Sequence, residues 1–304
     1  MTLTRFAPAP TGYLHLGHIA NALHVWSVAA TRGATVLLRI EDHDRQRCRA
    51  IYETALLEDL DWLGFVPDIG PTASYRGGPN TWRQSDNGQA YRAAVAQLRA
   101  AGHHVYACDC SRTTEPPVAI VSGETHSRPY SGRCRTRGLA EVRGNGLRVE
   151  LARGEETFVD LRIGVQRQSP AEQCGDLLLR DRLGNWSYQF CVVVDDLRQG
   201  IELIVRGEDL LDSTGRQLRL ARMLGREVMP AFLHHPLILK PGGEKLSKSA
   251  RDSGVRDLRA DGMGREALFG LVLHKLGLSS DGRATSLPEA LAVVAESVGA
   301  RGSD

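Results

Sequence analysis

Apolar runs long enough to cross a bilayer are absent from this chain of 304 residues. Its first residues also lack the apolar core of a signal peptide, so we expect a soluble, cytoplasmic protein without a membrane partner. An excess of charge is missing too: the formal net charge is +2, so a polyanion would have to be met by a local patch. Six cysteines are too few for a disulfide framework in a chain of this size, which favours reducing conditions.

A local basic patch lies between Arg128 and Arg153. Seven arginines stand there against Glu141 and Glu150, namely Arg128, Arg133, Arg135, Arg137, Arg143, Arg148 and Arg153. Such a stretch is compatible with ordinary solvated surface and with a surface that binds nucleic-acid phosphates. The sequence leaves both interpretations open.

A strand, a turn and a helix open the chain. Residues 2–6 predict a short strand, which prolines and Gly12 interrupt, and apolar residues at helical spacing follow. The first N–H groups of a helix have no intrahelical partner and attract anions, so this turn is suited to phosphate. His15 and His18 flank Gly17 at the helix start and could hydrogen-bond a phosphate during its transfer. A plain strand-to-helix turn of an α/β protein would show the same spacing.

A second phosphate-binding pattern lies far along the chain. Lys245, Ser247 and Lys248 follow a glycine pair and place two cations and a hydroxyl in one glycine-flanked loop. Either element alone is a weak pattern. Both occur here, in this order.

Together the two segments resemble the HIGH and KMSKS signatures of class I aminoacyl-tRNA synthetases. The wording Arg-Phe-Ala-Pro-x-Pro-Thr-Gly-Tyr-Leu-His-x-Gly-His over residues 5–18 is similar to the glutamyl branch. The resemblance implies an α/β fold with a Rossmann-type catalytic domain. It also implies catalytic roles for His15, His18, Lys245 and Lys248, and an ATP site made of these four residues with Gly17 and Ser247.

The same resemblance implies a glutamate site. Its residues would be Arg5, Phe6, Ala7, Pro8, Ala9, Glu41, Tyr188 and Arg206. A planar guanidinium such as that of Arg206 can bind a carboxylate through two hydrogen bonds, although pairing with Glu208 or Asp209 is the alternative. Ala9 departs from the family, which commonly has serine there, and so removes one hydroxyl contact to the amino acid.

Four parts are expected along the chain. Residues 1–102 and 185–240 form the two halves of the nucleotide-binding domain, 103–184 an insertion, and 241–304 the lysine loop with a helical tail. A strand over 34–40 completes a strand–helix–strand unit, which predicts a parallel sheet and places Glu41 at its ligand-binding edge. Asp42 or Asp44, with Arg45 as partner, is expected to cap the helix that follows. Further helices are expected over 51–63 and 89–101 and from Ser213 or Thr214, and strands over 190–196, 201–205 and 236–240.

Three cysteines gather inside the insertion. Cys108, Cys110 and Cys134 lie within 27 residues, and thiolates at this spacing can share one zinc ion in a structural site. On chemistry alone His126 would be the preferred fourth ligand. The short glutamyl-synthetase paralogues carry Cys-x-Cys followed by Tyr-x-x-x-Cys, and that resemblance points to Tyr130. Three unliganded loop cysteines remain the simpler alternative.

The chain most resembles those short paralogues, because only a short helical tail follows the lysine loop where full-length glutamyl-tRNA synthetases continue into an anticodon-binding region. The resemblance implies a monomer that uses ATP with magnesium to activate L-glutamate and transfers it to queuosine in the anticodon loop of tRNA(Asp). Ser249 departs from the glutamine frequent in these paralogues. The alternatives are a truncated synthetase that charges tRNA(Glu), transfer to a small molecule or carrier protein, and a non-catalytic relic.

Overall fold

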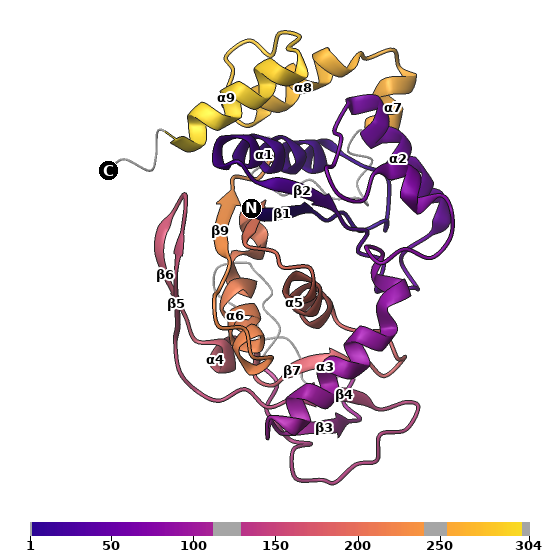
Figure 1. Ribbon diagram of the computed structural model, residues 1–304, viewed down its shortest axis with the longest axis vertical. Helices are drawn as coiled ribbons and strands as arrows, with labels where there is room; N and C mark the ends of the chain where they lie inside the picture. The colour runs from indigo at the N-terminus through magenta and orange to yellow at the C-terminus, as the bar shows by residue number, and fades with distance from the viewer. Residues whose placement is uncertain (1, 112–128, 240–253, 300–304) are drawn as a thin grey trace.

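A six-stranded, mostly parallel sheet lies at the centre of the catalytic half, in a computed structural model that describes residues 2–111, 129–239 and 254–299 (Figure 1). The strand order is β2 (Thr35–Leu38), β1 (Leu3–Phe6), β8 (Leu203–Gly207), β9 (Ala231–His235), β5 (Glu156–Asp160) and β6 (Gly164–Gln168). Neighbouring strands run parallel except for the β5–β6 hairpin. The α/β architecture predicted from the sequence is confirmed.

The first strand–helix–strand unit forms as predicted. Helix α1 (Leu16–Arg32) joins β1 to its parallel neighbour β2 and buries Ile19, Leu23 and other apolar residues at helical spacing. It ends at Gly33, whose φ of 59° is left-handed and suits glycine. The unit therefore sets β1 and β2 side by side with their carboxyl ends at one edge of the sheet.

The C-terminal helices cover the far side of α1. Figure 1 shows α1 between the sheet and the pair α8 (Arg265–Lys275) and α9 (Leu287–Gly299), with α7 (Val255–Ala260) nearer to α2 (Ala50–Leu63). Ser27 on α1 donates a hydrogen bond to the Leu291 carbonyl across this interface, at 2.8 Å. The tail thus completes the main apolar core, to which α8 and α9 contribute buried side chains.

A second, three-stranded antiparallel sheet forms the other end of the molecule. Its order is β3 (Val105–Cys108), β4 (Gly146–Val149) and β7 (Leu177–Arg180), with α4 (Pro170–Cys174) leading into β7. Helix α3 (Gly88–Ala100) packs beside it (Figure 1). The segment 103–184 contributes strands to both sheets, because β5 and β6 join the large one.

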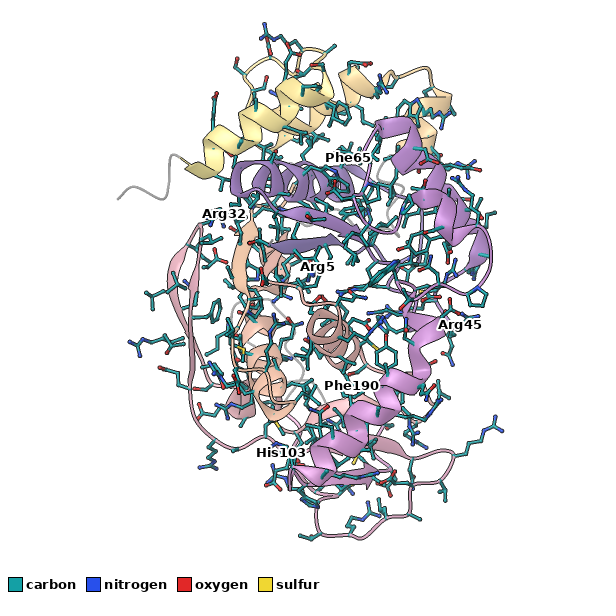
Figure 2. All side chains as sticks on the ribbon, in the orientation of Figure 1. Arg5, Arg32, Arg45, Phe65, His103 and Phe190 are labelled. Carbon is teal, nitrogen blue, oxygen red and sulfur yellow. The ribbon has the colours of Figure 1, made fainter. Side chains whose placement is uncertain are left out.

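The strand predicted over residues 190–196 is wrong: this segment lies within helix α5 (Tyr188–Arg198). A continuous apolar run does not distinguish a buried strand from a buried helix, and the β-branched valines favoured the strand. The Ser187 hydroxyl accepts from the Phe190 N–H and caps the helix. Figure 2 shows Phe190 on α5, which lies between the two sheets and is buried from residue 190 to 196.

Two smaller expectations are also wrong. The last strand, predicted over residues 236–240, is β9 and ends at His235, since Pro236 has no N–H for a sheet ladder. Asp42 and Asp44 do not cap α2, whose N-cap residue is Arg49 without a side-chain cap.

Helix α6 (Thr214–Met223) has Ser213 at its N-cap position, again without a side-chain hydrogen bond. The short 3-10 helices are η1 (Thr72–Tyr75), η2 (Gln84–Asn87) and η3 (Glu208–Ser213).

Within the described ranges, no helix combines the length and the hydropathy that crossing a membrane would require.

We predict that Gly270→Ala lowers the free energy of unfolding. A Cβ at this position of α8 would lie 1.9 Å from the Arg283 carbonyl oxygen, a backbone atom that would have to move. The overpacking cost therefore lies at the upper end of ~1–3 kcal/mol and exceeds the gain in helix propensity of about 1 kcal/mol. Gly299→Ala is the control, since an added Cβ there meets no atom within 4 Å. Thermal unfolding of both variants checks this, and a Gly270→Ala protein at least as stable as the parent would contradict it.

Candidate active site and metal centre

A cavity of about 260 Å³ opens at the carboxyl ends of the central strands. It is lined by Arg5, Ala7, Asn21, Glu41, Tyr188, Val205, Arg206 and Leu210. Strand β1 connects through α1 to β2 on one side and pairs with β8 on the other, so the chain order reverses between β1 and β8. Open α/β sheets bind their ligands at such a switch point. Figure 2 shows Arg5 near the centre of the molecule, below β1.

A buried ion-pair network forms the floor beside this cavity. The Arg39 guanidinium, which is fully buried, pairs with Asp196 at 2.6 Å and with Glu41 at 2.9 Å, and Arg5 pairs with the same Asp196 oxygen at 3.1 Å. Burial opposes the charge of Arg39, but these carboxylates outweigh it and raise its pKa well above the ordinary value. The network ties β1, the end of β2 and helix α5 together through charge.

Arg206 is held differently. It is 4 % exposed, and its guanidinium donates to three uncharged groups: Gln217 Oε1 at 2.6 Å, Thr214 Oγ1 at 2.8 Å and His234 Nε2 at 3.0 Å. Among the described residues no carboxylate pairs with it, and Glu208, one of the two alternatives considered above, pairs with Arg162 instead. Burial lowers the pKa of Arg206, as expected of a cation without an anionic neighbour in contact.

The buried side chain of His234 accepts a hydrogen bond from Arg206 and is itself held by Asp160. The Nδ1 of His234 lies 2.7 Å from Asp160, whose carboxylate also accepts from the His234 backbone N–H. Burial lowers the pKa of His234, so the ring is neutral, with its proton on Nδ1 facing Asp160 and the Nε2 lone pair facing the Arg206 Nε–H. Asp160 thus fixes the tautomer that lets His234 accept from arginine.

The cavity offers groups of both charges to a small zwitterion. Arg206 supplies an unneutralised guanidinium that a carboxylate can pair with, and Glu41 supplies a carboxylate across the cavity. Burial raises the pKa of Tyr188, so its hydroxyl keeps its proton and can donate. An amino acid with an additional acidic group matches this set of partners.

The two histidines of the opening motif lie together at the start of α1. The ring centroids of His15 and His18 are 4.0 Å apart. His15 Nδ1 accepts from the Gly17 N–H at 3.1 Å, and His18 Nδ1 accepts from the His15 N–H at 3.1 Å. Each neutral ring therefore carries its proton on Nε2, as a donor suited to phosphate oxygens. A Cβ on residue 17 would lie 3.0 Å from the His15 ring, so glycine fits this cap.

The second phosphate-binding pattern falls outside the described residues. Lys245, Ser247 and Lys248 belong to the segment 240–253, as does Ser249. Gly254 is the first described residue after it, and it forms a bridge with His15. The Val255 N–H donates to the Leu14 carbonyl at 2.8 Å. The chain that leaves the lysine segment is thus attached to the turn that carries the histidines.

The remaining residues of the expected glutamate site lie at the end of β1 and in the turn that follows it. Phe6 packs in the core against Trp26, and its carbonyl accepts from the Arg39 N–H. The Pro8 carbonyl accepts from the Glu41 N–H at 3.0 Å, and the Ala9 carbonyl accepts from Thr11 at 2.8 Å. These residues hold the turn through their backbone.

Several residues at the site carry no sequence signal. Asn21 lines the cavity from α1, and His234, Gln217 and Asp196 orient its arginines from distant parts of the chain. In the sequence, the only signal among them is the His-His pair at the end of β9, which follows the apolar residues of that strand. The partners of Arg206 are separated along the chain, so spacing could not find them.

The cysteine cluster forms in the second sheet. The Sγ atoms of Cys108, Cys110 and Cys134 all lie within 4.8 Å of one another. Cys110 and Cys134 are 3.5 Å apart, much longer than a disulfide bond of about 2.05 Å and close to the ~3.8 Å edge of a tetrahedron with Zn–S bonds near 2.3 Å. The donor set and spacing fit a closed zinc site.

Tyr130, the fourth ligand that the resemblance implies, lies beside this cluster. Its hydroxyl is 3.5 Å from Cys108 Sγ and 3.1 Å from the Cys134 N–H. The Arg148 guanidinium covers the Tyr130 ring at 3.8 Å. The alternative ligand His126 lies outside the described residues. The Asp109 carboxylate also lies near Cys110 and Cys134, but it pairs with Arg137.

The family is decided by comparison with known proteins. A profile described as the catalytic domain of class I tRNA synthetases (E and Q) matches residues 1–289. The chain belongs to this family. A Symbiobacterium thermophilum protein named "Glutamyl-Q tRNA(Asp) synthetase" is 40% identical over 287 residues, which cover 91% of this chain and 87% of that protein. Its fold and family make this chain a class I aminoacyl-tRNA synthetase-like ligase.

Full-length synthetases match over part of their length. The "Glutamate--tRNA ligase 2" of Acidithiobacillus ferrooxidans is 40% identical over 85% of this chain but 55% of that protein. A crystal structure of a glutamate tRNA ligase from Elizabethkingia meningosepticum, in complex with its amino acid, superposes with a TM-score of 0.73 at 27% identity. It matches 95% of this chain and 64% of its own. The resemblance seen in the two signature motifs extends to the whole catalytic fold.

We predict about one zinc per chain, bound by Cys108, Cys110, Tyr130 and Cys134. Cys134→Ser should sharply lower the zinc content measured by elemental analysis, because it removes one of the three sulfur ligands. Cys174→Ser is the matched control, since this cysteine lies beside Tyr130 in the fold but its Sγ faces the Pro170 carbonyl.

The same measurement separates the two candidate fourth ligands. Metal retained by Tyr130→Phe and lost from His126→Ala would assign the fourth position to the histidine. A metal-free parent protein of normal stability would show that the thiols are ordinary.

Proposed function

We propose that this protein activates L-glutamate with ATP and transfers the glutamyl group to queuosine in the anticodon of tRNA(Asp). The carrying observation is the buried guanidinium of Arg206, which has no carboxylate in contact among the described residues and faces a cavity with Glu41 and Tyr188. The names of the relatives support a glutamyl-synthetase-like enzyme, and several bear the glutamyl-Q name. The acceptor is the finer part of the proposal.

Activation needs no nucleophile from the protein. One oxygen of the substrate α-carboxylate attacks the α-phosphorus of ATP, and pyrophosphate leaves. The enzyme positions the two substrates and stabilises the charge that develops. His15 and His18, through their Nε2 protons, would donate to the phosphates, and Lys245, Ser247 and Lys248 would meet the departing pyrophosphate.

In the glutamate cavity, Arg206 and Arg5 would bind carboxylate and Glu41 the ammonium group. Ala9 leaves out one hydroxyl contact. Magnesium would arrive on the ATP phosphates, because the cysteine cluster is the only group of three or more potential ligands among the described residues. Zinc would act only by holding the loop that carries its ligands.

The basic patch contributes less to tRNA binding than its composition suggests. Arg135 pairs with Asp176 at 2.6 Å, Arg137 pairs with Asp109 at 2.7 Å, and Arg148 donates to the Asp176 carbonyl. These three arginines are thus used in contacts that hold the loop carrying Tyr130 and Cys134. Phosphate contacts are therefore assigned to other members of the patch, among them Arg153 beside a cavity of about 570 Å³.

The second candidate function is a truncated synthetase that charges tRNA(Glu) or passes glutamate to another acceptor. The match to a glutamate–tRNA ligase at 40% identity supports it. The chain spans 55% of that ligase, so whatever the rest of the ligase contributes has no counterpart in the matched region. A non-catalytic relic is less consistent with the preserved pair of oriented histidines and the unneutralised Arg206.

We predict ATP–pyrophosphate exchange with glutamate and ATP alone, and far weaker exchange with glutamine. Arg206→Ala should lower exchange about 30-fold or more, because removing one partner of a desolvated charge pair costs ~2–5 kcal/mol. The exposed Arg167, which pairs with Glu155 on the sheet edge, serves as the control in Arg167→Ala. Exchange that requires tRNA, or equal use of glutamine, would refute activation as proposed.

We predict that labelled glutamate appears on tRNA(Asp) that carries queuosine. The label should survive removal of the 3′-terminal adenosine, because the ester would lie in the anticodon loop, where bases can be splayed out and read. Unmodified tRNA(Asp) and tRNA(Glu) are the controls. Label that depends on an intact 3′ end would favour the charging alternative.

A further inference from the structure

A second cavity lies beside the candidate glutamate cavity, between the same two chain segments. It has a volume of about 340 Å³, and its lining includes His43, Arg45, Ser85, Asn185 and Trp186. The glutamate cavity is lined by residues two positions away on each segment, Glu41 and Tyr188. The rings of His43 and Tyr188 are 6.1 Å apart and stand between the two cavities.

His43 is held in one orientation by a buried chain of hydrogen bonds. Its Nδ1 lies 2.8 Å from Gln84 Oε1, and the Gln84 amide nitrogen donates to Asp195 at 2.8 Å. Asp195 is fully buried and also binds Arg198 and the Tyr91 hydroxyl. Because the Asp195 carboxylate only accepts, the Gln84 amide nitrogen must face it and the amide oxygen must face His43.

This chain sets the tautomer of His43. An amide oxygen cannot donate, so the Nδ1 of His43 carries the proton and its Nε2 carries a lone pair. No described residue is recorded as a partner of that Nε2. The Asp–Gln–His arrangement thus presents a basic nitrogen at the boundary of the two cavities, oriented by a third group as in other activated bases.

The second cavity has features that suit a nucleoside. Trp186 gives it an aromatic wall on which a base can stack, and the mostly exposed Arg45 stands at its edge, where a phosphate could approach. The Ser85 Oγ is buried without a hydrogen-bond partner in the described structure. Buried polar groups are normally hydrogen-bonded, so this hydroxyl lacks the partner that its burial calls for. Figure 2 shows Arg45 on the outer side of the loop that carries it.

We propose that the second cavity binds the hydroxyl-bearing nucleoside acceptor and that His43 is the general base of the transfer step, an inference that rests on the proposed function. The acceptor oxygen bonds to the carbonyl carbon of glutamyl-adenylate. The bond from that carbon to the phosphate oxygen breaks, and AMP leaves with the electron pair. The acceptor proton passes to Nε2 of His43. The ester forms without any other reactant.

The test compares transfer with activation in the same preparations. In His43→Asn the amide nitrogen can replace the Nδ1 donor to Gln84, but the basic Nε2 is lost. The acceptor is the tRNA that the parent protein glutamylates, either queuosine tRNA(Asp) or tRNA(Glu). In His43→Asn, single-turnover transfer from preformed adenylate to this tRNA should fall ~10²–10⁴-fold, whereas ATP–pyrophosphate exchange should not fall with it. His274→Asn is the control, an exposed histidine on α8.

Chemical rescue separates a base from a packing residue. In His43→Ala, added imidazole should restore transfer in proportion to its concentration, because the cavity beside residue 43 admits it. Parallel loss of transfer and exchange, or transfer unchanged in His43→Asn, overturns the role of His43. Glutamylation of tRNA(Glu) alone would refute the queuosine assignment while leaving the His43 comparison valid. A parent that activates glutamate but glutamylates neither tRNA overturns both.

Discussion

The buried guanidinium of Arg39 is the interaction on which the candidate site depends. It carries a full charge at a position that water does not reach, and it is tolerated because Asp196 and Glu41 supply carboxylates. These partners come from helix α5 and from the turn after β2, so the ion pairs decide how α5 sits against the parallel sheet. Breaking such a buried pair by removing one member costs on the order of 3–5 kcal/mol. The shape of the glutamate cavity therefore depends on this ion-pair network, although most residues that line the cavity do not belong to the network.

Two buried arginines in one molecule illustrate how surroundings separate structure from chemistry. Arg39 is neutralised by carboxylates, and its pKa is raised well above the ordinary value by them despite burial. Arg206 is surrounded by an amide, a hydroxyl and a neutral imidazole, and burial lowers its pKa. The charge of Arg39 is thus already compensated within the protein. The charge of Arg206 is not, and a substrate carboxylate could compensate it, which is why the proposed function rests on Arg206.

The family and the α/β fold could be predicted from the sequence because two short motifs have distinctive wording. Arg5, Glu41, Tyr188 and Arg206, named from the motifs, do line one cavity. The sequence predicts a strand where helix α5 forms, because a segment that is buried on all sides lacks the periodicity that distinguishes a helix from a strand. The partners His234, Asp160 and Asp196 could not be foreseen, because each meets its arginine only after distant strands and helices pack. His43 has no signal of its own in the sequence, because its orientation depends on Gln84 and Asp195, which meet it only in the folded chain.

Strand β7 connects the loop that carries Tyr130 and Cys134 with the second cavity. Tyr130 forms a bridge with Gly175, and its backbone N–H donates to the Cys174 carbonyl. Strand β7 follows at once, and Arg180 at its end forms a bridge with Trp186. A change at the metal ligands that shifted this strand would also shift the aromatic wall. Thermodynamic linkage is reciprocal. If bound zinc raises the affinity of the second cavity for a ligand, that ligand raises the affinity of the cysteine cluster for zinc by the same factor. The affinity of the cysteine cluster for a metal ion would then depend on whether the second cavity is occupied.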